Sequence, residues 1–252
     1  MTVLPVSPID APGTGEAAWR SWAGLGRLPE RDLAGCGSLV VLAAHPDDEV
    51  LGAGGIIALL AAAGARIRLV AVTDGEASHP GCADPAGLAR RRAAERAAAL
   101  QALGAASAEV IRLRLPDAGL AGRDPELAAA AGELTAGFAL CLAPWERDAH
   151  ADHEAVGRAA RQAHAAGQAP GALAHFPVWA WHWARPADPR LPWGRAVRVR
   201  LPAPAAARKR AAIGCFASQL EPRPGGRGPV LAPSFVAHFT RRDEVLFGVH
   251  RS

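Results

Sequence analysis

Two short segments carry the side chains in this sequence that could do chemistry. The first is HPDDE at residues 45–49, directly after an apolar run, and the second is HADH at residues 150–153, which also follows an apolar run. A catalytic divalent cation needs three or four imidazole or carboxylate ligands from separate parts of the chain, with one position open for water. His45, Asp48 and His153 could supply that set.

Strand-like and helix-like segments alternate from residue 38 onward. The expected strands span 38–44, 67–73, 109–113 and 139–143, and the expected helices span 50–64, 85–103, 125–136 and 153–166. This alternation predicts an α/β fold with a mostly parallel sheet and helices on both faces. Both chemical segments follow expected strands, at the carboxyl ends where open parallel sheets bind their ligands.

The pattern becomes less regular after residue 167. A strand-like run spans 173–183, a further strand is expected at 197–201, and a helix is expected at 205–217. On a strand, Trp179, Trp181 and Trp183 would share one face, where they could stack on a sugar or simply pack on the sheet. We interpret residues 1–37 as an N-terminal extension that packs on a single domain of residues 38–252.

Composition excludes several classes of protein. The chain has a net charge of +4, yet Lys209 is its only lysine, and no basic cluster with interleaved aromatics indicates nucleic-acid binding. The four cysteines are widely spaced and are expected to be free thiols. Neither a signal peptide nor an apolar stretch long enough to span a membrane is evident, so a cytoplasmic protein is predicted.

The two segments, together with several others, resemble the LmbE-like (PIG-L) family of metal-dependent N-acetylglucosaminyl deacetylases. The resemblance covers about residues 38–219 and rests on AHPDDE at 44–49, TDGE at 73–76, the helix at 92–103, HADH at 150–153 and the stretch from Lys209 to Gln219. It implies a Rossmann-like fold and a hydrolase that removes an acetyl or other acyl group from an N-acylated amino sugar or glycoconjugate. The partner would be that small molecule, and the oligomeric state stays open, a homo-oligomer included.

Carried over by position, the resemblance makes His45, Asp48 and His153 the metal ligands and Asp47 the general base. The two adjacent carboxylates would diverge in an extended or turning loop, so that one binds the ion while the other faces a water molecule. Zn²⁺ is the expected cofactor. Because two histidines and one carboxylate also match non-haem iron sites, Fe²⁺ remains open.

The resemblance also assigns His150 to stabilising the tetrahedral oxyanion, a role best performed as an imidazolium. Asp152 could hold its other ring nitrogen and raise its pKa, completing the catalytic group. Several family members place a tyrosine shortly before this motif, whereas this chain has no tyrosine and carries Asp148 nearby. Oxyanion stabilisation is therefore expected from the metal and His150.

Glu49, Glu76 and Arg91 are the candidates for binding substrate hydroxyls. A supporting or solvated role is an equal alternative for the two glutamates, and Arg91 and Arg92 could simply form a helix face. The histidines and aspartates could also be turn and capping groups. A dinucleotide site is disfavoured, because the glycines near residue 52 lack the third glycine of G-x-G-x-x-G. An amidase acting on a non-sugar or thiol-conjugate amide, and a binding protein without catalysis, are the functional alternatives.

Overall fold

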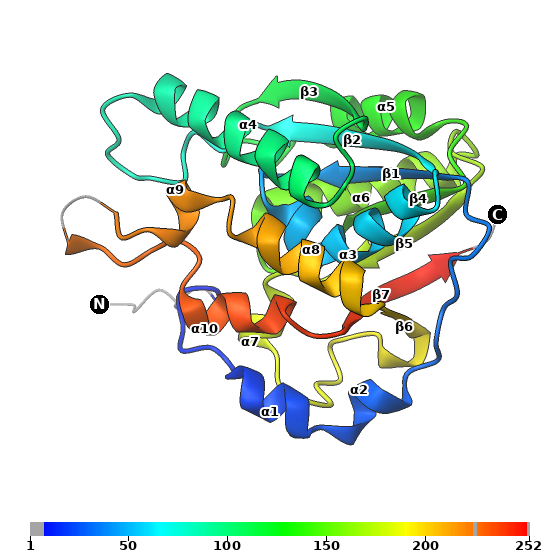
Figure 1. The fold of residues 1–252 in the computed structure, drawn as a ribbon. Helices are drawn as coiled ribbons and strands as arrows, with labels where there is room; N and C mark the ends of the chain where they lie inside the picture. The colour runs from blue at the N-terminus through cyan, green and yellow to red at the C-terminus, as the bar shows by residue number, and fades with distance from the viewer. Residues whose placement is uncertain (1–7, 224–225, 251–252) are drawn as a thin grey trace.

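The computed structural model describes residues 8–223 and 226–250, and a seven-stranded sheet forms its centre (Figure 1). The strand order is β3-β2-β1-β4-β5-β7-β6. β7 is antiparallel to both of its neighbours, and every other pairing is parallel. The strands are β1 (Ser38–Ala43), β2 (Arg66–Thr73), β3 (Glu109–Leu115), β4 (Leu140–Pro144), β5 (Ala172–Phe176), β6 (Ala196–Arg200) and β7 (Asp243–His250).

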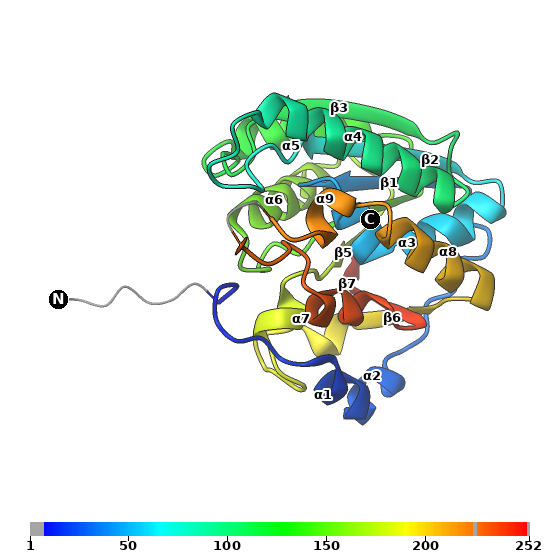
Figure 2. The same cartoon turned by 60° about the vertical axis from the view of Figure 1, so that its left-hand side comes forward.

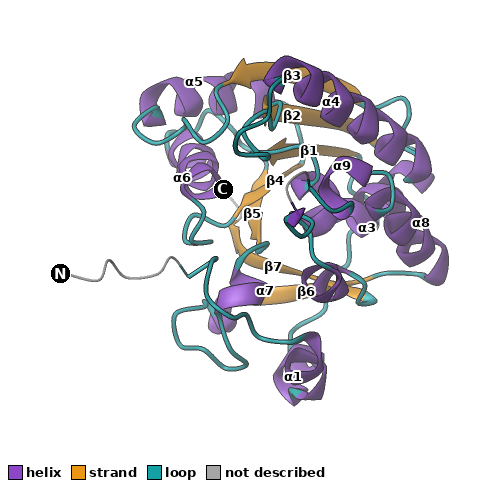
Figure 3. Ribbon diagram, turned by 90° about the vertical axis from the view of Figure 1, so that its left-hand side faces the viewer, coloured by secondary structure: helices purple, strands orange, loops and turns teal. Residues whose placement is uncertain are grey.

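Helices cover both faces of the sheet, as the view along the strands shows (Figure 3). One face carries α3 (Asp48–Ala62), α4 (Pro85–Ala102) and α8 (Ala203–Ile213), and the other carries α5 (Asp124–Thr135) and α6 (Ala151–Ala165). Successive residues of β1 divide between two apolar clusters, with Leu39 and Val41 in one and Val40 and Leu42 in the other. The predicted α/β class is confirmed.

The first strand, β1, is the point where the chain changes direction across the sheet. From β1 the chain moves outward through β2 and β3, then returns to place β4 on the other side of β1. The loops after β1 and β4 therefore diverge and leave a crevice between them, the usual ligand position in open α/β sheets. Val40 pairs with Cys141, so the segments at 45–49 and 150–153 leave neighbouring strands at the same edge.

Two expectations about the second half of the chain are wrong. The strand-like run at 173–183 ends with β5, and α7 (Ala180–Trp183) follows, so the three tryptophans do not share a strand face. The Asp148 carboxylate accepts the backbone N–H groups of Val178, Trp179 and Ala180, which turns the chain into that helix. β7 was not expected at all, although its backbone joins β5 to β6.

The N-terminal segment packs beside β6 and α7 (Figure 2). It contains α1 (Glu16–Ser21) and α2 (Ala23–Arg27), and the buried Trp19 indole donates a hydrogen bond to the Trp181 carbonyl at 2.8 Å. Its first seven residues lie outside the described part, and the division into an extension and one domain stays a prediction. Within the described residues, we find no helix with the length and apolar character needed to cross a bilayer.

A buried ion pair between Lys209 and Glu244 joins α8 to β7. The Lys209 ammonium donates to Glu244 Oε1 at 2.6 Å, and the same carboxylate accepts the backbone N–H groups of Gly55 and Ile56. Lys209→Ala would leave a buried carboxylate without its counter-charge and should lower the free energy of unfolding by about 3 kcal/mol. Urea denaturation measures this, with the exposed Arg210→Ala on the same helix as control. Equal losses in the two variants would contradict the prediction.

A second ion-pair cluster ties α1 to the C-terminal part of the chain. Glu16 accepts hydrogen bonds from His238 at 2.8 Å and from Arg241 at 2.9 Å. Burial alone would raise the pKa of Glu16, but His238, Arg241 and Arg20 outweigh burial and lower the pKa to about 2. An unfolded glutamate titrates near pH 4.3, so this stabilisation is complete above roughly that pH and is lost as the pH falls toward 2.

Glu16→Gln should therefore lower the free energy of unfolding by about 2 kcal/mol at pH 7, where the native carboxylate is charged. The gap between the wild type and the variant should narrow steadily below pH 4. Urea denaturation of both proteins between pH 7 and pH 2.5 follows that gap. A gap that stays constant over this range would show that the charge of Glu16 does not contribute.

Candidate active site

A cavity of about 370 Å³ opens at the crevice between the loops that follow β1 and β4. Its lining includes Asp47, Asp48 and His45 from the first loop, and His150 and His153 from the second. Two segments separated by about a hundred residues of sequence thus meet in one cavity, as their positions at strand ends predict.

His45, Asp48 and His153 converge on one point. His45 Nδ1 lies 3.3 Å from His153 Nε2 and 3.4 Å from Asp48 Oδ2, and His153 Nε2 lies 3.1 Å from Asp48 Oδ1. Two ligand atoms held about 2.1 Å from a tetrahedral zinc ion lie about 3.4 Å apart. The spacing and the chemistry of the three donors fit a divalent cation.

Further carboxylates hold the outer nitrogens of both histidines. Asp148, which is fully buried, lies 2.8 Å from His153 Nδ1, while Asp117 and Asp152 lie 3.2 Å and 3.3 Å from His45 Nε2. A proton on each outer nitrogen leaves the inner nitrogen with a free lone pair, which is the arrangement usual around metal-binding histidines. It leaves His45 Nδ1 and His153 Nε2 free to bind a cation.

The charge balance of the cluster favours a positive charge at its centre. Burial alone would lower the pKa of His153, but Asp48 and Asp148 outweigh burial and raise the pKa to about 9. The pKa of His45 is raised for the same reason, by Asp117, Asp152 and Asp48 against burial. In the absence of a metal a proton can provide this positive charge, and a cation bound there would replace it.

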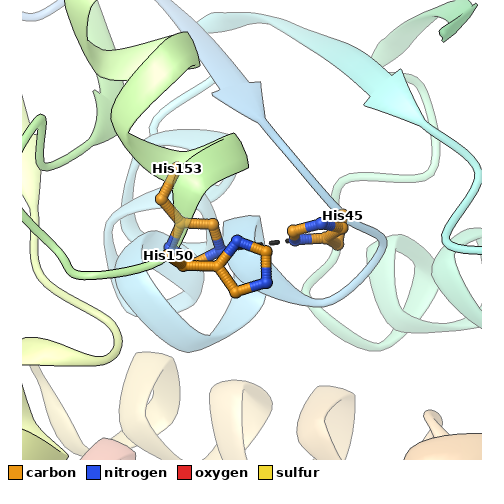
Figure 4. A group of neighbouring side chains, drawn as sticks. All are labelled: His45, His150 and His153. Carbon is orange, nitrogen blue, oxygen red and sulfur yellow. Dashed lines mark hydrogen bonds between the residues drawn. The ribbon is translucent and has the colours of Figure 1, made fainter. Parts of the chain in front are cut away.

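His150 lies beside this group, and its ring stacks on that of His153 at a centroid distance of 4.7 Å (Figure 4). His45, His150 and His153 each bring one ring nitrogen to within 4.8 Å of the others. Burial, His153 and His45 lower the pKa of His150 to about 3, so the ring is neutral near pH 7. This shift works against the imidazolium expected for the ring, and the role of His150 stays a prediction.

Asp152 also differs from the sequence expectation, in which its carboxylate holds His150. Only its backbone N–H reaches that ring, donating to Nδ1 at the start of α6. The Asp152 carboxylate instead accepts the N–H groups of Ala118 and Leu120 and contacts His45, because the first turn of α6 points it across the crevice. With Nδ1 accepting a hydrogen bond, neutral His150 carries its proton on Nε2 and is a hydrogen-bond donor there.

Asp47 occupies the position before the first residue of α3, yet its side chain caps no N–H group of that helix. Its φ of 134° is a strained conformation for a residue with a side chain, of the kind that recurs at functional sites. The carboxylate accepts a hydrogen bond from Arg92 at 3.0 Å. Burial raises the pKa of Asp47 to about 7, although the Arg92 charge opposes that shift.

Arg92 fixes the loop that carries Asp47. Its guanidinium also donates to the Pro46 carbonyl at 2.6 Å and to the Gly75 carbonyl at 2.9 Å. The side chain is buried and lines the cavity. Of the two adjacent arginines of α4 that were considered, the structure therefore places Arg92 at the site.

The three candidates for binding substrate hydroxyls lie away from the cavity wall. Glu49 is completely buried and accepts the Asp47 N–H, and Glu76 accepts the Asp117 N–H. Arg91 faces outward from α4, where it pairs with Glu95 and with Glu221. The glutamates support the loops of the site, and the contact of these three residues with substrate stays a prediction.

Sequence reasoning overlooked the roles of Asp148 and Asp117. From the sequence, Asp148 was noted only as the residue near the position of a tyrosine in relatives, and no role was assigned to Asp117, which follows the third expected strand. A signal for Asp148 existed, since a carboxylate five residues before a ligand histidine can turn back to that ring. No comparable local signal marks Asp117, which reaches His45 only through the tertiary fold.

The sequence matches one protein family, and the structure resembles several solved structures. The sequence profile of the family described as PIG-L: GlcNAc-PI de-N-acetylase matches residues 40–164. The conserved protein TT1542 from Thermus thermophilus has a similar structure, with 30% sequence identity and a TM-score of 0.54, over 73% of this chain and 80% of that one. A search of curated proteins found no match.

Two deacetylases of known structure share the fold at lower identity. The A40926 pseudoaglycone deacetylase Dbv21 has 22% identity and a TM-score of 0.62, over 86% of this chain and 98% of that one. The N,N'-diacetylchitobiose deacetylase from Pyrococcus horikoshii has 18% identity and a TM-score of 0.54, over 82% and 80%. The matching profile spans both strand-end segments that form the cavity, and the chain belongs to the PIG-L (LmbE-like) family.

Proposed function

We propose that the protein is a metal-dependent hydrolase that removes the acyl group from an N-acylated amino sugar or glycoconjugate. The observation that carries this proposal is the convergence of His45, Asp48 and His153 beside the buried carboxylate of Asp47. Membership of a family described as a GlcNAc-PI de-N-acetylase, and structural similarity to an N,N'-diacetylchitobiose deacetylase and an A40926 pseudoaglycone deacetylase, support an N-acyl sugar as substrate.

We propose that His45, Asp48 and His153 hold Zn²⁺, with Fe²⁺ as the alternative that the same donors would accept. When bound, such an ion would supply Lewis acidity, which polarises the amide carbonyl and makes a neighbouring water molecule more acidic. Asp148, Asp117 and Asp152 would keep the ligand histidines in place.

The remaining chemistry falls to two side chains of the cavity. Asp47 would take a proton from the attacking water and pass it to the leaving amine, since a pKa of about 7 suits both steps near neutral pH. His150 would donate its Nε2 proton in a hydrogen bond to the carbonyl oxygen as negative charge develops there. In the net reaction water cleaves the C–N bond and yields an amine and a carboxylate.

Metal analysis combined with an amine-release assay tests the proposal. The assay panel contains N-acetylglucosamine, its methyl glycoside, N,N'-diacetylchitobiose and a non-sugar amide, N-acetylcysteine. We expect about one metal ion per chain, amine release from the sugars, loss of activity with a chelator and recovery on adding Zn²⁺. Release from N-acetylcysteine alone would favour the amidase alternative. Bound metal without amine release from any member would favour a binding protein.

A further inference from the structure

One wall of the candidate active-site cavity is apolar. Its residues are Val178, Trp179, Val230, Leu231 and Phe235. All five come after residue 164, where the match to the family profile ends. The wall therefore lies outside the segment that the family profile matches, and most of it comes from connecting segments of the kind that often carry binding residues.

Contacts within the protein hold the apolar wall in place. Trp179 stacks on Phe235 from α10 (Pro233–Val236), with ring centroids 4.6 Å apart and planes at 30°. The backbone N–H of Trp179 is held by Asp148 at 2.8 Å, and that of Leu231 donates to the Gln219 carbonyl at 2.9 Å. These contacts fix the apolar surface in position before any ligand arrives.

The side of the cavity nearest β1 and α4 carries Asp47 and Arg92, and the side nearest β5 carries Val178 and Trp179, so the first is polar and the second apolar. Asp47 and Arg92 form the polar end, where their side chains pair at 3.0 Å. Trp179 begins the apolar wall beside His150, with ring centroids 6.4 Å apart and planes at 21°. At about 370 Å³ the cavity falls within the range of about 300–1,000 Å³ that accommodates whole small ligands.

The polar and apolar ends of the cavity indicate in which direction each side of the scissile amide lies. This step rests on the proposed function, in which Asp47 protonates the leaving amine and His150 bonds the carbonyl oxygen. The amine side, with its hydroxyl groups, then lies toward Asp47 and Arg92. The carbon chain on the carbonyl extends in the opposite direction, past His150 and along Trp179.

We propose that the apolar wall binds an acyl chain longer than acetyl, so that the preferred substrate is an amino sugar carrying a fatty or other large apolar acyl group. Burial of each added methylene against the wall would favour binding through the hydrophobic effect. Water would cleave the same C–N bond, releasing the amino sugar and a fatty carboxylate.

A series of N-acetyl-, N-butyryl- and N-octanoylglucosamine tests the proposal with the full-length, metal-loaded protein. We expect kcat/KM to rise at least about tenfold from acetyl to octanoyl, because a single methylene in an apolar pocket can already discriminate by about that factor. Equal values across the series would overturn the proposal while leaving the proposed function intact. No hydrolysis of any member would overturn the proposed function itself.

A matched pair of variants tests whether the apolar wall causes the preference for a long acyl chain. Val230 lines the wall and is partly exposed, so Val230→Asn should fold and should reduce the octanoyl-to-acetyl ratio of kcat/KM to about one. Val110→Asn makes the same change at an exposed valine of β3, outside the cavity, and should keep the wild-type ratio. An unchanged ratio in Val230→Asn would overturn the assignment to this wall.

The octyl glycoside of N-acetylglucosamine distinguishes the two sides of the amide. It carries the same apolar chain on the amine side, and we expect no gain in kcat/KM over the methyl glycoside. A gain of about tenfold there, without one in the acyl series, would place the wall on the amine side and overturn the proposal.

Discussion

Asp47→Asn should lower kcat by about 10² to 10⁴-fold while the metal content stays at the wild-type level. Asparagine keeps the shape of the side chain and can still bond to Arg92, but it cannot accept a proton from water. The two adjacent carboxylates contact different partners, Asp48 the two histidines and Asp47 the guanidinium of Arg92. Loss of the Asp48 carboxylate should therefore impair metal binding, and loss of the Asp47 carboxylate should impair turnover.

Steady-state kinetics with metal analysis of the same sample measures both quantities. Asp32→Asn changes an exposed aspartate outside the cavity lining, so it is the matched control and should keep wild-type activity and metal. If Asp47→Asn lost its metal, Asp47 would be a ligand and the proposed division between base and ligand would be wrong.

His153→Ala should lose most of its bound metal. The substitution removes one of three donors and also leaves Asp148 buried without its imidazole partner. Even a partner that only positions a ligand typically contributes about 10–100-fold to metal affinity, so removing a ligand itself should cost at least that factor. Competition with a chromophoric zinc chelator measures the affinity without reference to activity.

His164→Ala provides the control for that measurement, because His164 lies on the same helix and its ring contacts only the Ala169 carbonyl among the described contacts. It should keep wild-type affinity. Stoichiometric metal of unchanged affinity in His153→Ala would remove His153 from the proposed ligand set.

Local patterns were enough to predict the first half of the fold. β1 and β4 are apolar runs that end at polar motifs, and α4 begins with Pro85 after the capping residue Asp84, so both periodicity and end signals were present. Later, side-chain contacts over long distances decide the structure. Asp148 turns the tryptophan run into α7, and β7 exists as a strand through pairing with β5 and β6.

The candidate site was likewise predictable only in part. The segments holding His45 and His153 could be located because each comes after the carboxyl end of an apolar strand. The partner of the Asp152 carboxylate could not be predicted from the sequence, because the start of α6 points that carboxylate at His45 instead of at the nearby His150. The choice of Arg92 over Arg91 also depends on helix orientation, because neighbouring residues on a helix face directions about 100° apart.

The contacts of Asp148 limit which substitutions the segment at 177–180 can accept. One carboxylate holds both the ring of His153 and the backbone N–H of Trp179, so the proposed cation site and the apolar wall are positioned by the same side chain. The segment at 177–180 is therefore coupled to the candidate active site through Asp148. An engineer who transplants residues 177–180 from a relative to alter chain-length preference would have to preserve the three N–H donors that Asp148 accepts, or the transplant would disturb the histidine as well.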